Sequence, residues 1–352
     1  MVINTFKDGK RFWGINNEEN MTIDAIIGNP PYQVLDGGAQ ASASPVYHLF
    51  VNAAIQLKAQ YVSMIMPARW YAGGRGLDEF RASMLQDKHI KRLDDFTNPE
   101  TVFPGTNIRG GICYFLRDRS YDNTDSLVNI VSHTQDNATV SKLRPMRIEN
   151  VDTFVRDSEA IEILNKVRNK CSNFMDDYIS PLRPFGFRGY FVNDINFRST
   201  ADSLLHPIVC YGKGKQIGYV ERDLIQVHKD WIDEWKVIMP RANNIGTELP
   251  DDNLNAFIGK PKTICTESYL VIGGGKGLSQ LQCSNLCSYL RTKFARFMHR
   301  LAKSSQDATS KTFSFVPLVD FNRTLEDKDL YAYFGLSEQQ ISYIDNAIKP
   351  MD

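Results

Sequence analysis

The sequence lacks long apolar runs and has no excess of charge of either sign. No apolar stretch approaches the roughly 18 residues that a membrane span requires, and residues 1–14 lack the apolar core of a secretion signal. We therefore expect a cytoplasmic protein without membrane contact. Lysine plus arginine number 41, as do aspartate plus glutamate. Composition therefore does not decide for or against a nucleic-acid partner, because the local distribution of charge governs such an interface.

Neither a metal site nor a nuclease centre is indicated. The six cysteines are scattered, and only Cys283 and Cys287 are close, at helical spacing. No second Cys/His pair has zinc-like spacing, so we expect no metal and packed thiols in a reducing compartment. Asp251 and Asp252 are adjacent acids, but no acid-x-Lys partner follows them.

The most informative stretch is DAIIGNPPYQ, residues 24–33. Its first four residues have the pattern of a short buried strand. Pro30 and Pro31 cannot continue a strand because they lack N–H donors. The sequence therefore predicts a core strand that ends abruptly in a rigid loop with an aromatic residue at its tip.

Strands and helices alternate after this loop. A hairpin or strand is predicted before it over Lys10–Ile15, helices over 44–57 and 76–87 after it, and strands over 61–67, 90–96 and 109–118. This alternation is typical of a parallel α/β sheet, whose ligands gather at the carboxyl ends of the strands. The proline-containing loop follows such an end.

The chain changes character between residues 120 and 160, where polar and β-branched residues increase. Beyond it we predict a helix over 157–174, short strands over 181–191, 206–223 and 235–244, a basic amphipathic helix over 284–303 and a capped helix over 337–348. We expect two domains, residues 1–155 and 156–352, the second of irregular α+β type.

Rigid acceptors in the loop suit a reaction at a planar amine. The lone pair of an amino group conjugated to a ring is delocalised, so the group is a poor nucleophile. The Asn29 carboxamide and the Pro30 carbonyl could accept hydrogen bonds from its two N–H groups and so free the lone pair. Because the loop holds these acceptors in place beforehand, their stabilisation of the reacting amine is worth a few kcal/mol. The Tyr32 ring offers a stacking face worth roughly 1–3 kcal/mol.

The stretch DAIIGNPPYQ resembles the (D/N)PP(Y/F) catalytic motif of N6-adenine DNA methyltransferases, specifically the type IIG and type I methylases of restriction-modification systems. MIMPARWYAGGRGLDEFRASML and ETVFPGTNIRGGICYF are similar to later parts of these enzymes, and the tail from CTESYLVIGGG onward more loosely resembles their target-recognition region. The resemblance implies a partial Rossmann-like methyltransferase sheet in residues 1–155 and a C-terminal α+β target-recognition domain in residues 156–352.

The resemblance also implies roles for individual residues. It assigns catalysis to Asn29, Pro30, Pro31 and Tyr32, with Asn29 and Pro30 at the amino group of a flipped adenine and Tyr32 stacked on the base. Phe103 is assigned to pack against the flipped base, with an ordinary core position as the alternative.

Double-stranded DNA is the partner that the resemblance implies. The residues that we expect to contact phosphates are Lys213, Lys215, Arg241, Arg291, Arg296 and Arg300. A solvated helix face remains the alternative explanation for these charges.

The cofactor motif of the family is missing. S-adenosylmethionine is bound in these enzymes by a Gly-rich turn far upstream of the NPPY motif, whereas 28 residues precede Asn29 and none form such a turn. We therefore expect the chain to lack the N-terminal half that binds S-adenosylmethionine, with only Asp24 assigned to the cofactor. A separate chain could carry the cofactor motif or a nuclease. An alternative is circular order, with Gly273, Gly275 and Gly277 as the cofactor turn.

The leading interpretation is a site-specific adenine-N6 DNA methyltransferase. The alternative is a catalytically incomplete DNA-binding specificity subunit, or the C-terminal fragment of a split methylase. A third interpretation keeps the chemistry and changes the substrate to RNA adenine or protein glutamine, although the long second domain favours DNA.

Overall fold

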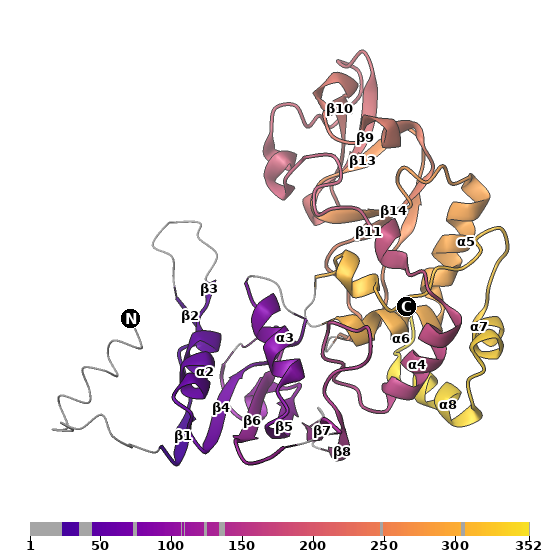
Figure 1. The fold of residues 1–352 in the computed structure, drawn as a ribbon. Coiled ribbons are helices and arrows are strands. Elements are labelled where there is room, and N and C mark those ends of the chain that lie inside the picture. Colours follow the sequence, from indigo (N-terminus) through magenta and orange to yellow (C-terminus); the bar gives the residue numbers. More distant parts are fainter. Residues whose placement is uncertain are drawn as a thin grey trace. The chain divides into compact units, whose positions relative to one another are not determined.

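The computed structural model describes residues 23–34, 44–72, 76–106, 108, 110–122, 125–133, 138–246, 249–303 and 307–351. The strand or hairpin predicted over Lys10–Ile15 lies outside these residues. Internal contacts divide the chain into two units, Met1–Ser158 and Glu159–Asp352. Figure 1 shows the elements of both units.

The first unit contains a six-stranded sheet with the order β1-β4-β6-β5-β7-β8. Its strands are β1 (Ala25–Gly28), β4 (Tyr61–Pro67), β5 (Ile90–Phe96), β6 (Ile112–Asp118), β7 (Leu127–His133) and β8 (Thr139–Pro145). The pairings β1–β4 and β5–β7 are parallel, whereas β6 is antiparallel to both β4 and β5, and β8 to β7. The α/β class is confirmed, but the wholly parallel sheet is wrong because β6 turns back and inserts between β4 and β5.

Two helices of the first unit lie between strands in the sequence. They are α2 (Tyr47–Gln56) and α3 (Asp78–Gln86), with the short 3-10 helices η1 (Ala68–Tyr71) and η2 (Pro99–Thr101). The first helix begins three residues later than predicted. Ser44–Pro45 forms strand β3 and pairs with β2 (Gln33–Val34), which follows the proline-containing loop.

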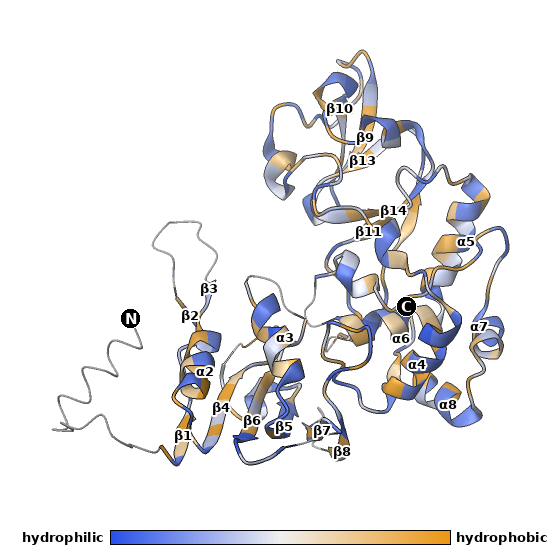
Figure 2. Ribbon diagram, in the orientation of Figure 1, coloured by the Kyte–Doolittle hydropathy of each residue, from blue (hydrophilic) through white to orange (hydrophobic). Residues whose placement is uncertain are grey.

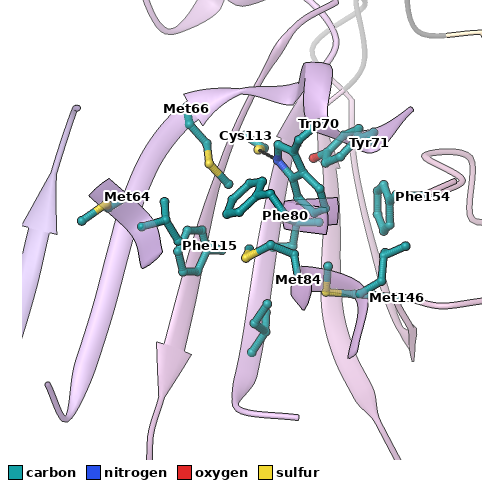
Figure 3. Packing of buried hydrophobic residues seen from close by; sticks show 14 of the residues in the cluster. Met64, Met66, Trp70, Tyr71, Phe80, Met84, Cys113, Phe115, Met146 and Phe154 are labelled. Carbon is teal, nitrogen blue, oxygen red and sulfur yellow. Dashed lines mark hydrogen bonds between the residues drawn. The ribbon is translucent and has the colours of Figure 1, made fainter. Parts of the chain in front are cut away.

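The core of the first unit lies on one face of its sheet. Cross-strand pairing places Met64, Phe115, Leu93 and Ile130 in one row, and all four are buried in a cluster with residues of α2 and α3. Figure 1 shows both helices in front of the sheet, and Figure 3 shows the aromatic and methionine side chains that fill this layer. Each fully buried side chain of this size contributes about 1.5–3 kcal/mol.

The opposite face of the sheet is more open. Ile27 on β1 is 80% exposed, and Leu143 on β8 is 65% exposed. Figure 2 shows apolar residues along β1. The prediction of a strand over 24–27 is confirmed, but its burial is not, because β1 pairs on one side with β4 and stands at the end of the strand order.

The second unit begins with α4 (Ala160–Lys170) and contains two three-stranded sheets, which confirms its α+β character. One sheet has β9 (Pro207–Tyr211), β10 (Ile217–Glu221) and β13 (Thr263–Cys265), and the other β11 (Lys236–Pro240), β12 (Phe257–Gly259) and β14 (Tyr269–Ile272). The strands predicted within 206–223 and 235–244 are confirmed. No strand forms over 181–191, where the chain instead enters a 3-10 helix.

The basic helix predicted over 284–303 is two helices, α5 (Gln280–Arg291) and α6 (Lys293–Ala302). Thr292 has ψ 146°, which ends α5, and its side chain accepts a hydrogen bond from the Ala295 amide. The Asp327 carboxylate accepts from the amides of Lys293 and Phe294 at 3.0 and 2.8 Å. These acceptors satisfy amides that a continuous helix would have bonded internally.

The remaining helices are α7 (Asp327–Phe334) and α8 (Glu338–Ala347), the second of which confirms the predicted capped helix. The remaining 3-10 helices are η3 (Met175–Tyr178), η4 (Gly189–Asn193), η5 (Lys213–Lys215), η6 (Arg222–Leu224), η7 (Lys229–Asp233) and η8 (Ser310–Phe313). Among the described residues, no helix combines the length and apolarity needed to cross a bilayer.

Candidate active site

Four strands of the first unit bring their following loops to one edge of the sheet. The pairings make β1, β4, β5 and β7 run in the same direction. The carboxyl ends of parallel strands meet at one edge, where open α/β sheets bind ligands. Residues 29–32 follow β1 and residues 97–111 follow β5, so the motif loop and the loop that contains Phe103 belong to this edge.

The four motif residues alternate between exposed and buried positions. Asn29 and Pro31 are exposed, Pro30 is buried and Tyr32 is half-buried. The Tyr32 carbonyl accepts a hydrogen bond of 3.1 Å from the Val46 amide, just before α2. The loop is therefore tied down at its end, while the Asn29 carboxamide faces solvent.

The hydroxyl end of the Tyr32 side chain is buried in the protein. This hydroxyl has no hydrogen-bond partner among the described residues. Burial and the nearby Cys113 thiol raise the pKa of Tyr32 to about 12. Trp70 Nε1 donates to Cys113 Sγ at 3.3 Å, and Figure 3 shows Trp70, Tyr71 and Cys113 together. The Tyr32 hydroxyl thus points inward, and the phenol is neutral at physiological pH.

Phe103 lies in a structured loop rather than a β-hairpin. The Asn98 side chain accepts from the Glu100 amide at 3.1 Å at the start of η2, and the Phe103 amide donates to the Pro99 carbonyl at 2.9 Å. The Phe103 side chain is half-buried. The chain forms η2 and a turn here before β6 starts at Ile112.

A charged cluster at the ends of β5 and β7 was not predicted. Arg92 Nε and Nη2 donate to the Asp94 carboxylate at 2.5 and 2.8 Å, and His133 Nε2 lies 3.1 Å from the same carboxylate. Burial opposes ionisation of Asp94, but these hydrogen bonds outweigh it and lower its pKa. The His133 ring stacks on Phe96 at 4.0 Å. His133 lies 39 residues after Asp94 in the sequence, so only the pairing of β5 with β7 brings it to this carboxylate.

The basic residues of the second unit differ in their accessibility. Lys213 and Lys215 are exposed in the turn between β9 and β10, and Arg291 is exposed at the end of α5. Arg241 is partly exposed and lies 3.5 Å from the Asp307 carboxylate. Lys213, Lys215 and Arg291 are therefore open to a partner.

Arg296 does not fit the phosphate contact predicted for it. Its residue is 3% exposed, and its guanidinium donates to the carbonyls of Thr292, Asp252 and Lys349. Arg300 is half-buried and donates to the Ala347 carbonyl. The prediction for Arg296 is wrong because this residue lies on a buried part of α6. Its guanidinium donates to buried carbonyls instead of facing solvent.

The triple glycine turn is filled by protein atoms. A Cβ on Gly274 would lie 2.5 Å from the Trp231 ring, and one on Gly275 would lie 2.6 Å from Trp231 Nε1. The Gly275 amide already donates to Glu234 Oε2 at 2.8 Å. Gly274 and Gly275 permit close packing against Trp231, which does not favour the circular order with Gly273, Gly275 and Gly277 as the cofactor turn.

Asp24 does not reach the motif loop either. It precedes β1, whereas Asn29 follows the other end of that four-residue strand, and such a strand spans roughly 13 Å at 3.3 Å per residue. Neither Asp24 nor the triple glycine turn therefore fits a site for S-adenosylmethionine. The described residues also contain no group of three or more side chains that could hold a metal ion.

Comparisons with known proteins identify relatives of the first unit. Residues 2–103 match the Eco57I restriction-modification methylase family. An uncharacterized adenine-specific methylase of Mycoplasma pneumoniae is 36% identical over 112 residues, which are 31% of this chain and 26% of the relative. The resemblance drawn from the NPPY motif is thereby confirmed over residues 2–103. The alternative of a catalytically incomplete specificity subunit, or of the C-terminal fragment of a split methylase, is not favoured.

Solved structures of restriction-modification enzymes are similar over more of the chain. The type IIL enzyme MmeI in complex with DNA is 10% identical, with a TM-score of 0.47, over 92% of this chain and 54% of MmeI. The type IIG restriction endonuclease BpuSI is 12% identical, with a TM-score of 0.32, over 88% of this chain and 48% of BpuSI. The chain thus spans about half the length of these two proteins and about a quarter of the curated relative.

Proposed function

We propose that this chain carries the adenine-binding part and the target-recognition part of a site-specific N6-adenine DNA methyltransferase of a restriction-modification system. The observation that carries the proposal is the NPPY loop at the carboxyl end of β1, with Asn29 exposed and Tyr32 half-buried. The substrate is double-stranded DNA, and S-adenosylmethionine is the methyl donor. The family match over residues 2–103 supports this assignment.

The loop would activate the adenine amino group by accepting its hydrogen bonds. An adenine flipped out of the duplex loses a few kcal/mol of stacking, which contact with the Tyr32 ring offsets by roughly 1–3 kcal/mol. The two N–H groups of N6 donate to Asn29 Oδ1 and the Pro30 carbonyl, so the lone pair becomes available for attack. The enzyme forms no covalent intermediate in this scheme. In this scheme the described residues bind the adenine and orient its N6 nitrogen for attack.

We infer that the Gly-rich cofactor motif lies outside the described residues. Neither Asp24 nor the triple glycine turn fits S-adenosylmethionine, and the chain spans 26% of its curated relative. β1 stands at the end of the described strand order, and its Ile27 side chain is 80% exposed, so a strand of a separate chain could add beside β1. Such a chain could carry the cofactor motif or a nuclease.

Expression of the gene together with its neighbouring reading frames tests the proposed function. We expect N6-methyladenine at one recurrent DNA sequence when the locus is placed in a host without adenine methylation. Modification-sensitive sequencing of the host genome measures it. A genome without this mark would contradict the proposal. Calorimetry with S-adenosylmethionine and the chain alone would then separate a self-sufficient enzyme from one that needs a partner.

Replacing Tyr32 by phenylalanine should leave methylation almost unchanged. The buried Tyr32 hydroxyl has no hydrogen-bond partner among the described residues, so its removal costs little and could add up to about 1 kcal/mol of stability. Tyr32→Ala removes the ring and should cost about 1–3 kcal/mol of transition-state binding. Methylation kinetics and thermal unfolding of both variants measure these effects. Equal losses in the two variants would show that the hydroxyl, rather than the ring face, is used.

Removing Lys213 and Lys215 should weaken binding to every DNA sequence alike. Each exposed lysine that contacts a phosphate contributes about 0.9 to the slope of log K against log salt. The slope, measured by fluorescence anisotropy with a non-specific duplex, should decrease by this amount for each Lys→Ala change. Lys328→Ala on α7, another exposed lysine, serves as the control. An unchanged slope in the double variant would place the DNA interface elsewhere.

A further inference from the structure

Arg156 connects the two ends of the loop that contains Phe103. Its Nε and Nη2 atoms donate to the two Asp95 carboxylate oxygens at 2.8 and 2.7 Å. Its Nη1 donates to the Gly110 carbonyl at 2.8 Å, and Nη2 also lies 3.3 Å from the Phe96 carbonyl. The guanidinium therefore joins the last residues of β5 to Gly110, two residues before β6.

The position of this guanidinium is strongly constrained. Asp95 is 1% exposed and the Arg156 side chain 22% exposed, so the pair is largely protected from solvent. The guanidinium lies 5.4 Å from the centre of the Tyr71 ring. A planar fork that makes two parallel bonds to a carboxylate has one orientation, which fixes the remaining N–H groups on the two carbonyls.

The backbone beside the guanidinium leaves no room for a side chain. Gly111 has φ +85°, and a Cβ there would overlap the Phe96 carbonyl oxygen and lie 2.7 Å from Arg156 Nη2. The Gly111 carbonyl accepts from the Ala68 amide at 3.0 Å, just after β4. The loop that follows β5 is thus closed at its base by Arg156 and tied to the loop that follows β4.

Arg156 also belongs to the segment that leads into the second unit. The contact division between the units follows Ser158. Arg144 Nη2 donates to the Val155 carbonyl at 2.6 Å, and Arg144 Nε donates to Ser158 Oγ at 2.8 Å. The segment around Arg156 is therefore fixed to the first unit up to the point where the second unit begins.

We propose that Arg156 is a positioning residue for base binding, which closes the 97–111 loop and sets the location of Phe103 at the strand-end edge. This inference rests on the proposed function, because it assigns the loop to the flipped adenine. Arg156 itself does not contact the base in this assignment. Its effect reaches the base through the backbone at Phe96 and Gly110.

Hydrogen exchange tests the closure of the loop without any assay of methylation. Lysine at position 156 keeps the charge, but its single ammonium cannot bond both Asp95 oxygens and both carbonyls at once. In R156K we expect amides within residues 97–106 and at Gly110 and Gly111 to exchange about tenfold faster or more. R92K is the matched control. Arg92 also makes two hydrogen bonds to a carboxylate of β5, that of Asp94, but its guanidinium does not bond the loop between β5 and β6. Equal exchange in the two variants would overturn the inference.

Methylation by the complete enzyme tests the role in base binding. We expect R156K to lower kcat about tenfold with little change in KM for DNA, because the exposed lysines of the second unit are untouched. R92K should keep normal kcat. Faster exchange in R156K with wild-type kcat would overturn the positioning role. If R156K exchanges faster but the wild-type enzyme itself does not methylate DNA, the proposed function is contradicted, whereas the closure of the loop by Arg156 is supported.

Discussion

Asn29→Ala is expected to lower methylation about 100- to 1,000-fold while DNA binding stays at the wild-type level. The Asn29 carboxamide is the side-chain acceptor that the proposed chemistry requires, and loss of one preorganised polar group at a reacting centre typically costs this much. Because Asn29 is exposed, folding should be unaffected. Methylation of DNA by the complete enzyme and anisotropy of the DNA complex measure the two properties.

Gln33→Ala is the matched control for Asn29→Ala. Gln33 is also an exposed carboxamide and lies four residues later, on β2, but it has no place in the proposed chemistry. We expect Gln33→Ala to methylate normally. Retention of activity in Asn29→Ala would refute the assignment of the NPPY loop as the catalytic site.

Gly111→Ala is expected to destabilise the first unit by about 3 kcal/mol. A Cβ at this position would meet the Phe96 carbonyl, a backbone atom that cannot rotate away, and would displace Arg156. The positive φ of +85° adds strain of about 1–2 kcal/mol to the cost of overpacking. At this size of unit the melting temperature should fall by roughly 8 °C, as measured by calorimetry.

Gly105→Ala separates backbone strain from steric overlap. Gly105 lies in the same loop with φ +76°, but a Cβ there would meet nothing within 4 Å. We therefore expect a loss of about 1–2 kcal/mol from strain alone. Similar melting temperatures for the two variants would mean that the contacts around Arg156 do not restrict Gly111.

Local sequence determined the elements and the motif. The strands over 61–67 and 90–96 have the predicted bounds, and the first of them ends at a proline, Pro67. Asn29–Tyr32 follow β1 as predicted, since two prolines cannot continue a strand. These features depend on properties of neighbouring residues, so the sequence alone contains them.

Tertiary packing decided which charged side chains are available. Arg296 and Arg291 lie on a stretch that is equally basic throughout, yet Arg296 is buried against three carbonyls and Arg291 is exposed. The break at Thr292 has the same origin, because the Asp327 carboxylate that satisfies the amides of α6 comes from a distant part of the chain. No local pattern specifies such partners.

In the candidate site, too, some features follow from the local sequence and others from tertiary packing. The sequence by itself contains the groups on which the proposed chemistry rests, an amide oxygen, a rigid carbonyl and an aromatic ring within residues 29–32. Only the tertiary structure decided that β6 runs against its neighbours, that Trp231 fills the triple glycine turn, and that Arg156 joins Asp95 to Gly110. The physical reason is that chemical identity belongs to single residues, whereas strand order, burial and ion pairing depend on contacts between segments that are far apart in the chain.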